Sequence, residues 1–464
     1  MFIGREKELS KLGELYEQDK FQMVVIYGRR RVGKTTLISE FCKDKEHIFF
    51  SAEIMNEKLN LKKFTKSVTS YFKVDYIKEF SDFEDGCKFL YSQAKDERVV
   101  LVMDEFPYLI NSNKTIASIL QNMIDHNFKN SKLFLILCGS SISFMEKEVL
   151  GYNSPLYGRR TYQMEIKPFS IYEVQSMFKD YTKDDIVKLY SIVGGTPHYL
   201  NQLDPNKSLD ENIKSYVLDY GSYLYTEPID LLRQELREVA VYNSILTAIA
   251  NGASKLNEIA TTIGEKTDKT ANYIKTLIEL RLLDKVIPIT EKSNSKKAIY
   301  VLKDNLFKFY YKYIINNKEL LEQGEVDVVY KNLDEDISVY IGHIFEDICV
   351  EYLRKANIKR ELPFLFEKIG KWWGNNKIRM RQEEIDITAL DNDNIMFCEC
   401  KWRNEKMKLK VLNELKEKVE CIDIEGKKVY YYLFSKSGFE ESLILMSEND
   451  NNNIKLINLE KIFS

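Results

Sequence analysis

QMVVIYGRRRVGKTTLISEFC, residues 22–42, decides the fold of the first part of the chain. An apolar, strand-like run leads into a loop, and the loop opens into a run with helical character. The loop meets the pattern G-x-x-x-x-G-K-T with Gly28, Gly33, Lys34 and Thr35. Because the pattern stands between an expected strand and an expected helix, it predicts a phosphate-binding loop.

The chemistry of this loop follows from its backbone. Two glycines let successive N–H groups and the N-terminus of the next helix face an anion. The ammonium of Lys34 suits the β- and γ-phosphates, and the hydroxyl of Thr35 suits Mg²⁺. We therefore expect ATP with Mg²⁺. The expected loop contacts are Gly28, Arg29, Arg30, Arg31, Val32, Gly33, Lys34, Thr35 and Thr36.

The residues up to about 199 alternate strand-like and helical runs, which is typical of a parallel α/β sheet with crossover helices. One apolar run, VVLVMDE, ends in Asp104 and Glu105, at the strand edge where ligands bind in open α/β sheets. We expect Asp104 to hold Mg²⁺ through its water shell and Glu105 to orient or polarise the attacking water. The expected strands are residues 22–27, 47–52, 99–104, 132–138 and 162–166.

Two later segments each leave two interpretations open. Ser140 and Ser141 follow the fourth expected strand, where a hydroxyl can sense the γ-phosphate or cap the following helix. Arg159 and Arg160 can neutralise charge on the transferring phosphate, as arginine fingers do, or lie in a surface loop. We take Ser140 and Arg159 as candidate nucleotide contacts.

An ordered set of motifs runs through the first part of the chain: FIGRE at residues 2–6, GRRRVGKT, LVMDEF, GSS, PLYGRR and GGTPHYL at residues 194–200. This set resembles the archaeal-type ATPases, relatives of the AAA+ and STAND classes of P-loop proteins. The resemblance implies that Phe2, Ile3, Gly4 and Arg5 line the adenine site. It also implies that the turn ending in Pro197, in a small helical lid, closes over the nucleotide.

Residues 241–315 predict a different module. Apolar spacing predicts three helices, and LLDKVIPITEKSNSKKAIYVL predicts two strands around a polar tip. This order is the outline of a winged helix-turn-helix with residues 268–280 as recognition helix. A packing or regulatory module without DNA contact fits the pattern equally well. The candidate DNA contacts are Lys269, Asn272, Lys275, Lys296 and Lys297.

The segments around this module are interpreted as connections. Residues 201–240 are expected to form a helical lid or linker, and the aromatic run at 304–314 a core-facing helix rather than a base-stacking platform. The polar stretch 316–336 is expected to separate it from the last domain. We therefore predict domains at residues 1–200, 201–240, 241–315 and 337–464.

The last domain holds a second set of charged residues. Glu346 lies in an amphipathic helical run, Asp386 in EEIDITAL, and Glu399 and Lys401 in MFCECKW. Strand alternation puts Glu399 and Lys401 on one face. Two carboxylates suit Mg²⁺ or Mn²⁺, and Lys401 can position water or stabilise a phosphoryl transition state.

This second set resembles the PD-(D/E)xK nuclease fold and the nuclease-related tail that often accompanies archaeal-type ATPases. The resemblance implies catalytic roles for Asp386, Glu399 and Lys401, and metal ligation by Glu346, Asp386 and Glu399. Ile385 stands where the pattern has proline. A degraded site whose charges form structural pairs is the alternative. A local phosphate-binding face, or a solvated helix face, is offered by Lys377, Arg379, Arg381, Lys401, Arg403, Lys406, Lys408 and Lys410.

Composition sets the outer limits. The chain has 464 residues, 44% of them hydrophobic and 30% charged, which indicates a soluble protein of several domains. Early charges and the lack of a long apolar run predict no signal peptide and no membrane association, so we expect a cytoplasmic location. The cysteine spacing predicts neither disulfides nor a zinc site. The net charge of −3 confines DNA contacts to local patches.

We therefore predict an α/β ATP hydrolase: a P-loop NTPase core with a helical lid, a winged helix-turn-helix and a restriction-endonuclease-like α/β tail. The leading hypothesis is that nucleotide state gates a DNA-directed, metal-dependent nuclease. The alternative is a STAND-like regulatory switch that controls contacts with a partner protein and carries an inactive tail. Oligomerisation stays open, because an arginine can act within its own chain or on a neighbour.

Overall fold

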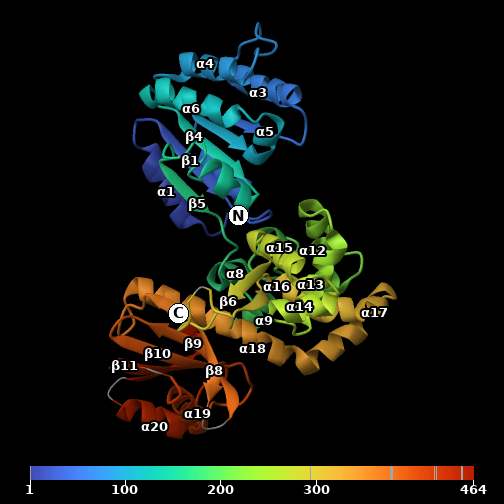
Figure 1. Ribbon diagram of the computed structural model, residues 1–464, viewed down its shortest axis with the longest axis vertical. Helices are drawn as coiled ribbons and strands as arrows, with labels where there is room; N and C mark the ends of the chain where they lie inside the picture. Colours follow the sequence, from blue (N-terminus) through green and yellow to red (C-terminus); the bar gives the residue numbers. More distant parts are fainter. Residues whose placement is uncertain (1, 293, 377–379, 423, 425, 451–452) are drawn as a thin grey trace. The chain divides into compact units, whose positions relative to one another are not determined.

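The chain divides into two compact units, described here one by one from a computed structural model (Figure 1). The first unit comprises Met1–Phe169 and Thr196–His198, and the second comprises Ser170–Gly195 and Tyr199–Ser464. The short segment Thr196–His198 thus leaves the second unit and returns to it. The residues that the structure describes are 2–292, 294–376, 380–422, 424, 426–450 and 453–464.

The first unit is built on a five-stranded parallel sheet with the order β2-β3-β4-β1-β5. All five predicted strands are present at their predicted positions, so the prediction of a parallel α/β sheet is confirmed. The strand order places β4 between β1 and β3, so that the carboxyl ends of these three strands lie at one edge. The strands are β1 (Gln22–Tyr27), β2 (His47–Ser51), β3 (Val100–Asp104), β4 (Phe134–Gly139) and β5 (Tyr162–Glu165).

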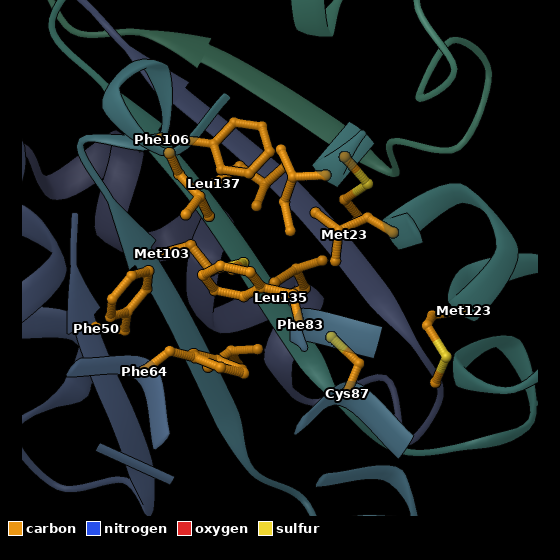
Figure 2. Packing of buried hydrophobic residues seen from close by; sticks show 14 of the residues in the cluster. Met23, Phe50, Phe64, Phe83, Cys87, Met103, Phe106, Met123, Leu135 and Leu137 are labelled. Atoms are coloured by element: carbon orange, nitrogen blue, oxygen red, sulfur yellow. The ribbon is translucent and has the colours of Figure 1, made fainter. Parts of the chain in front are cut away.

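Both faces of this sheet are buried, because alternate residues of each strand point to opposite sides. Met23 and Val25 of β1 belong to one core, shown in Figure 2, whereas Val24 and Ile26 belong to the other. Full burial of one such side chain contributes about 1.5–3 kcal/mol. Helices α3 (Glu57–Phe72), α4 (Phe83–Ala94), α5 (Phe106–Ser112) and α6 (Ile116–His126) supply the first core, and α1 (Glu6–Tyr16) and α2 (Lys34–Cys42) the second.

The second unit begins with helices. In the segment predicted as a winged helix, three helices precede a two-stranded antiparallel sheet, in the predicted order. The assignment of this segment to the winged-helix class stays a prediction. The elements are α8 (Ile171–Met177), α9 (Lys183–Val193), α12 (Tyr223–Glu235), α13 (Val239–Ala250), α14 (Leu256–Ile263), α15 (Thr267–Glu279), β6 (Leu283–Val286) and β7 (Ile299–Leu302).

The aromatic run at 304–314 forms α16 (Asn305–Phe309) and the π-helical turn η4 (Tyr310–Ile314), and its rings are buried. The prediction of a core-facing helix is therefore confirmed. The polar stretch 316–336 contains α17 (Lys318–Glu322) and the start of α18 (Val326–Lys359), and its role as a domain boundary stays a prediction. Among the described residues, no helix has the length and apolar content needed to cross a bilayer.

The tail of the second unit is a five-stranded mixed sheet with the order β12-β11-β10-β9-β8. Strand β9 is antiparallel to both of its neighbours, β8 and β10, whereas β10, β11 and β12 are parallel to one another. Leu412 and Leu415 of α19 (Leu409–Val419) pack with Ile385, Phe397 and Leu433 of the sheet. The strands are β8 (Lys368–Asn376), β9 (Arg381–Leu390), β10 (Asn394–Lys401), β11 (Lys428–Ser435) and β12 (Ile454–Asn458).

Candidate functional site

The loop between β1 and α2 encloses the ammonium group of Lys34. Its Nζ donates to the carbonyl oxygens of Gly28 at 2.9 Å and Arg29 at 2.8 Å. The side chain is 6% exposed, and burial lowers the pKa of Lys34. A Cβ on Gly28 would lie 2.3 Å from the carbonyl oxygen of Ile166, and Gly33 has a φ of 87°, so both positions require glycine. A buried cation at a helix N-terminus is a cradle for phosphate.

Two oxygen atoms suited to Mg²⁺ meet beside this loop. The Thr35 hydroxyl on α2 donates to Oδ2 of Asp104, at the end of β3, over 3.0 Å. The other carboxylate oxygen, Oδ1, accepts the backbone N–H of Glu105 at 2.9 Å. Asp104 is 5% exposed, so its carboxylate is fixed in place by both contacts. Oxygen donors in this arrangement fit a hydrated Mg²⁺ ion.

Glu105 is held in an uncommon backbone conformation next to these oxygens. Its φ of 49° and ψ of 44° are left-handed, which is rare for residues other than glycine. Its Oε2 accepts the hydroxyl of Ser140 at 2.9 Å. Ser141, by contrast, makes no side-chain cap to the following helix, so the capping interpretation is wrong for this residue. The hydrogen bond between Ser140 and Glu105 follows from the strand order, because these residues stand just past the ends of the neighbouring strands β4 and β3.

Two segments far apart in the sequence reach the loop. The guanidinium group of Arg5 donates to the carbonyl oxygens of Val32 at 3.1 Å and Lys167 at 2.5 Å, and Arg5 is 6% exposed. The N–H of His198 donates to the carbonyl oxygen of Arg31 at 3.3 Å. Pro197 lies beside Gly33, with its Cγ 3.9 Å from the position of a Cβ there.

The candidate arginines are bound within the first unit. Arg159 donates from Nε and a terminal nitrogen to the Asp125 carboxylate of α6, at 3.1 and 2.5 Å. Hydrogen bonds from Arg159 and Lys129 hold the pKa of Asp125 at about 2. Arg30 donates to the hydroxyl of Tyr108 at 2.5 Å. Nothing in the sequence pairs these residues, because the partners are distant in the chain.

The tail sheet brings Asp386, Glu399 and Lys401 together. Oδ2 of Asp386 on β9 accepts the backbone N–H of Cys400 on β10 at 2.8 Å. Nζ of Lys401 lies 2.6 Å from Oε1 of Glu399. Burial, followed by the charges of Glu399 and Glu346, raises the pKa of Asp386 to about 7. Burial lowers the pKa of Lys401, but the charges of Glu399 and Asp386 outweigh it and leave that pKa raised.

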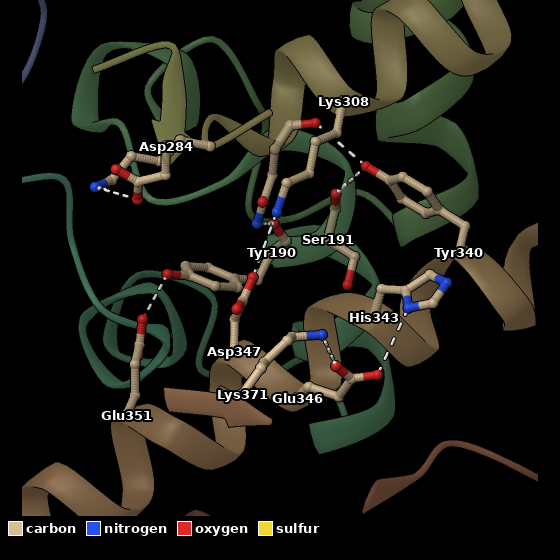
Figure 3. A network of polar contacts seen from close by, with 12 residues as sticks. Tyr190, Ser191, Asp284, Lys308, Tyr340, His343, Glu346, Asp347, Glu351 and Lys371 are labelled. Carbon is tan, nitrogen blue, oxygen red and sulfur yellow. Dashed lines mark hydrogen bonds and ion pairs between the residues drawn. The ribbon is translucent and has the colours of Figure 1, made fainter. Parts of the chain in front are cut away.

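The remaining acid of the predicted set, Glu346 on α18, has cationic partners of its own. It pairs with Nζ of Lys371 on β8 and lies 3.5 Å from Nδ1 of His343 (Figure 3). Burial raises the pKa of Glu346, but His343 and Lys371 outweigh it and leave it below its ordinary value. Among the described residues, no three His, Cys, Asp or Glu side chains are arranged to hold a metal ion.

The predicted DNA contacts of the middle segment include two lysines in ion pairs. Lys269 lies 3.1 Å from a Glu265 oxygen, and Lys297 lies 2.6 Å from a Glu291 oxygen. On the tail, Lys377 and Arg379 lie outside the described residues. Arg381 pairs with Glu383 at 2.7 Å. These ion pairs compete with phosphate, so a DNA contact through them stays a prediction.

Comparison with known proteins places this geometry in a family. Residues 2–203 match a profile described as an ATPase domain predominantly from Archaea. An uncharacterized protein of Methanocaldococcus jannaschii is 36% identical over 442 residues, which cover 94% of this chain and 96% of that protein. The chain belongs to this archaeal ATPase family. As a member, it carries an ATPase domain in residues 2–203, and the expected resemblance to archaeal-type ATPases is confirmed for that part.

Other comparisons match separate parts of this archaeal ATPase. An uncharacterized ATP-binding protein of M. jannaschii is 44% identical over 46 residues, 10% of this chain and 78% of that protein. The Walker-type ATPase of Pyrococcus abyssi shares the fold, with a TM-score of 0.51 and 19% identity over 67% of this chain and 96% of its own. Residues 310–414 match archaeal and bacterial proteins of unknown function.

Proposed function

We propose that the first unit binds ATP and hydrolyses it with Mg²⁺. The observation that carries this proposal is the hydrogen bond from Thr35 to Asp104, 3.0 Å long, beside the buried ammonium of Lys34. The three groups come from the phosphate-binding loop and the end of β3. Together they offer one cation and two oxygen donors at the edge of the sheet where nucleotides bind in this architecture.

Each residue of the loop has a role that its contacts support. Lys34 exchanges its two carbonyl partners for phosphate oxygens, while the backbone N–H groups at the start of α2 face the same anion. Thr35 and Asp104 would hold Mg²⁺, which would neutralise charge on the phosphate oxygens. Glu105 orients the attacking water and accepts its proton, and Ser140 keeps the Glu105 carboxylate in position.

The nucleoside is assigned to the segments that reach the loop from either side. Phe2, Ile3, Gly4 and Arg5 are proposed to line the adenine site, with Arg5 fixing the loop through Val32. Pro197 is proposed to cover the nucleotide, because Thr196–His198 already lies against the loop. Arg159 remains a candidate for the γ-phosphate, and would have to leave Asp125 to reach it.

For the tail we propose a metal-dependent DNA nuclease site. Asp386 and Glu399 fit a divalent cation, because two buried carboxylates repel each other unless a proton or cation lies between them. Lys401 is placed to stabilise charge on a phosphoryl group. Glu346 completes the set only if it exchanges Lys371 for the cation.

Helix α18 is proposed to couple the two activities. It carries Glu346 and also Glu351, whose carboxylate accepts the Tyr190 hydroxyl of α9 at 2.8 Å and the backbone N–H of Ile171 at 3.1 Å (Figure 3). Beyond α9 the chain passes through Gly194 to Thr196–His198, next to the phosphate-binding loop. If a change of nucleotide state moves this segment, the movement passes along the chain to α9. It then reaches α18 through the hydrogen bond between Tyr190 and Glu351.

Because the pKa of Glu351 is raised in the fold, we expect the free energy of unfolding to depend on pH through its carboxyl group. Burial raises the pKa of Glu351 from 4.5 to about 7, despite the lowering by its two hydrogen bonds. Its contribution to the stability of the fold is therefore complete below pH 4.5 and lost as the pH rises through about 7. Glu351→Gln should match the wild type at pH 4.5 and exceed it by up to ~3 kcal/mol at pH 9.

Denaturant unfolding followed by tryptophan fluorescence measures this difference, because Trp372, Trp373 and Trp402 all lie in the second unit. Tyr190→Phe removes a bond that lowers the pKa, so it should move the pH window upward. Glu361→Gln, at an exposed position past the end of α18, is the control and should leave the pH profile unchanged. Equal stabilities of wild type and Glu351→Gln at pH 9 would contradict the assignment.

A cleavage assay tests the nuclease proposal. Linear, circular and single-stranded DNA are incubated with Mg²⁺ or Mn²⁺, with and without ATP. Lys401→Met should lower cleavage about 10- to 100-fold, because it removes the cation nearest the carboxylates while keeping the apolar stem. Lys428→Met, an exposed lysine at the start of β11 and at the opposite end of the β10–β11 pair from Lys401, is the matched control. Lys34→Ala should change the dependence of cleavage on ATP.

A regulatory switch is the second candidate, and a specific observation favours it. Glu346 and Glu399 are already paired with lysines, which is how a degraded nuclease site would satisfy its buried charges. In that case nucleotide state controls contacts with a protein partner and the tail is a scaffold. ATP turnover without cleavage of any DNA, under every metal condition, would favour the switch and reject the nuclease.

A further inference from the structure

The Glu399 carboxylate is held by a second lysine that lies outside the predicted motif. Nζ of Lys418, on α19, lies 3.0 Å from Oε2 and 3.4 Å from Oε1 of Glu399. Lys401 contacts Oε1 from the same strand. Leu412 and Leu415 pack α19 against the sheet, and this packing brings Lys418 to Glu399. The side chains of Glu399 and Lys418 are only 8% and 19% exposed.

Lys418, which contacts Glu399, also lines a groove. The groove has a volume of about 530 Å³. Its lining contains three cationic side chains and two acidic ones, and Lys410 is only 3.6 Å from Glu414 across one turn of α19. Cationic side chains such as Lys418 can contact a phosphodiester, whereas Arg381 is already paired with Glu383 and Lys410 with Glu414. The lining residues are Arg381, Lys410, Asn413, Glu414, Glu417 and Lys418.

A divalent cation and Lys418 repel each other when both contact the Glu399 carboxylate. Both oxygens of the carboxylate accept from an ammonium group, so a metal ion bound there would be repelled by two adjacent positive charges. Lys418 is the partner free to move, because its four-carbon stem is flexible and its other side faces the groove. Lys401, in contrast, extends from the same strand as Glu399 and stays near it when α19 side chains rearrange.

We propose that Lys418 holds Glu399 until a nucleic-acid phosphate enters the groove. Lys418 then pairs with that phosphate, and Glu399 becomes available to a divalent cation beside Asp386. Metal binding and nucleic-acid binding are thereby coupled at one side chain, so the site acquires its metal only when substrate is present. This inference rests on the proposed nuclease function of the tail and names Lys418 as its positioning residue.

Mn²⁺ titration of the full chain without nucleotide, followed by electron paramagnetic resonance of the free ion, tests this coupling. Wild type, Lys418→Met and Lys418→Gln are compared with and without a short DNA duplex. Without DNA, Lys418→Met should bind Mn²⁺ at least ~10-fold more tightly than wild type, a typical size for coupling between two ligands. DNA should tighten Mn²⁺ binding to wild type and leave Lys418→Met nearly unchanged.

The controls separate this inference from the nuclease proposal. Lys416→Met changes a lysine of the same helix that does not line the groove, and it should behave as wild type. Lys418→Gln keeps a hydrogen-bond donor without the charge, and decides the result if Lys418→Met does not fold. Equal Mn²⁺ affinities in wild type and both variants overturn the inference but leave the nuclease intact. No Mn²⁺ binding by any protein, with or without DNA, overturns both.

Discussion

Glu105→Gln is expected to lower the kcat of ATP hydrolysis at least ~100-fold, because a neutral amide cannot accept the proton of the attacking water. Binding of ATP should be unchanged, since the proposed phosphate contacts come from Lys34 and the loop. The amide also keeps the volume of the side chain and can accept the Ser140 hydroxyl through its oxygen. The left-handed backbone of the residue is untouched. The variant therefore separates catalysis from binding.

Steady-state phosphate release and equilibrium binding of a fluorescent ATP analogue measure the two effects. Glu97→Gln, an exposed carboxylate before β3, is the matched control and should keep full activity. Ser140→Ala should give a smaller loss, because it frees the Glu105 carboxylate without removing it. A fully active Glu105→Gln protein would remove Glu105 from the catalytic role and reopen the choice of general base.

Lys34→Ala should abolish measurable ATP binding and, with it, hydrolysis. The loop would lose its buried cation, and truncation of one partner of a buried charge contact weakens binding by at least ~30-fold. The carbonyl oxygens of Gly28 and Arg29 would also lose their donor. We therefore expect an affinity for ATP too weak to detect at micromolar protein.

Calorimetric titration with ATP and Mg²⁺ measures this loss. Lys43→Ala, at the exposed end of α2, changes a lysine of the same helix and should bind ATP as wild type does. Circular dichroism checks that the sheet is intact. Retained micromolar affinity in Lys34→Ala would contradict the placement of the phosphates at this loop.

The parts of the site that lie close together in the sequence were predictable. A short sequence pattern next to an apolar strand identifies the loop from Gly28 to Thr35. The same is true of the pair Asp104–Glu105. The parallel sheet follows from the same alternation, and so does the burial of the aromatic run at 304–314. In these cases local spacing fixes which face is polar and which is apolar.

The ion-pair partners of the acidic and basic site residues were not predictable from the spacing of residues in the sequence. Lys371 and Lys418 reach Glu346 and Glu399 from other elements, and an isolated lysine in a charged chain carries no signal of its partner. Arg159 was singled out for its motif, yet its bond to Asp125 depends on where α6 packs. The course of α18 through residues 326–336 was missed, although Val329 and Leu333 stand four residues apart, lie on one face of the helix and are both buried.

That continuous helix has a consequence for how tails of this kind can be exchanged during evolution. A crossover between two related genes preserves a fold only where few contacts span the break. Because α18 runs unbroken from Val326 to Lys359, a junction inside it would splice two helices whose apolar stripes must agree in phase. A chimera that exchanges the mixed sheet should therefore keep the helix that precedes it and be joined ahead of Val326.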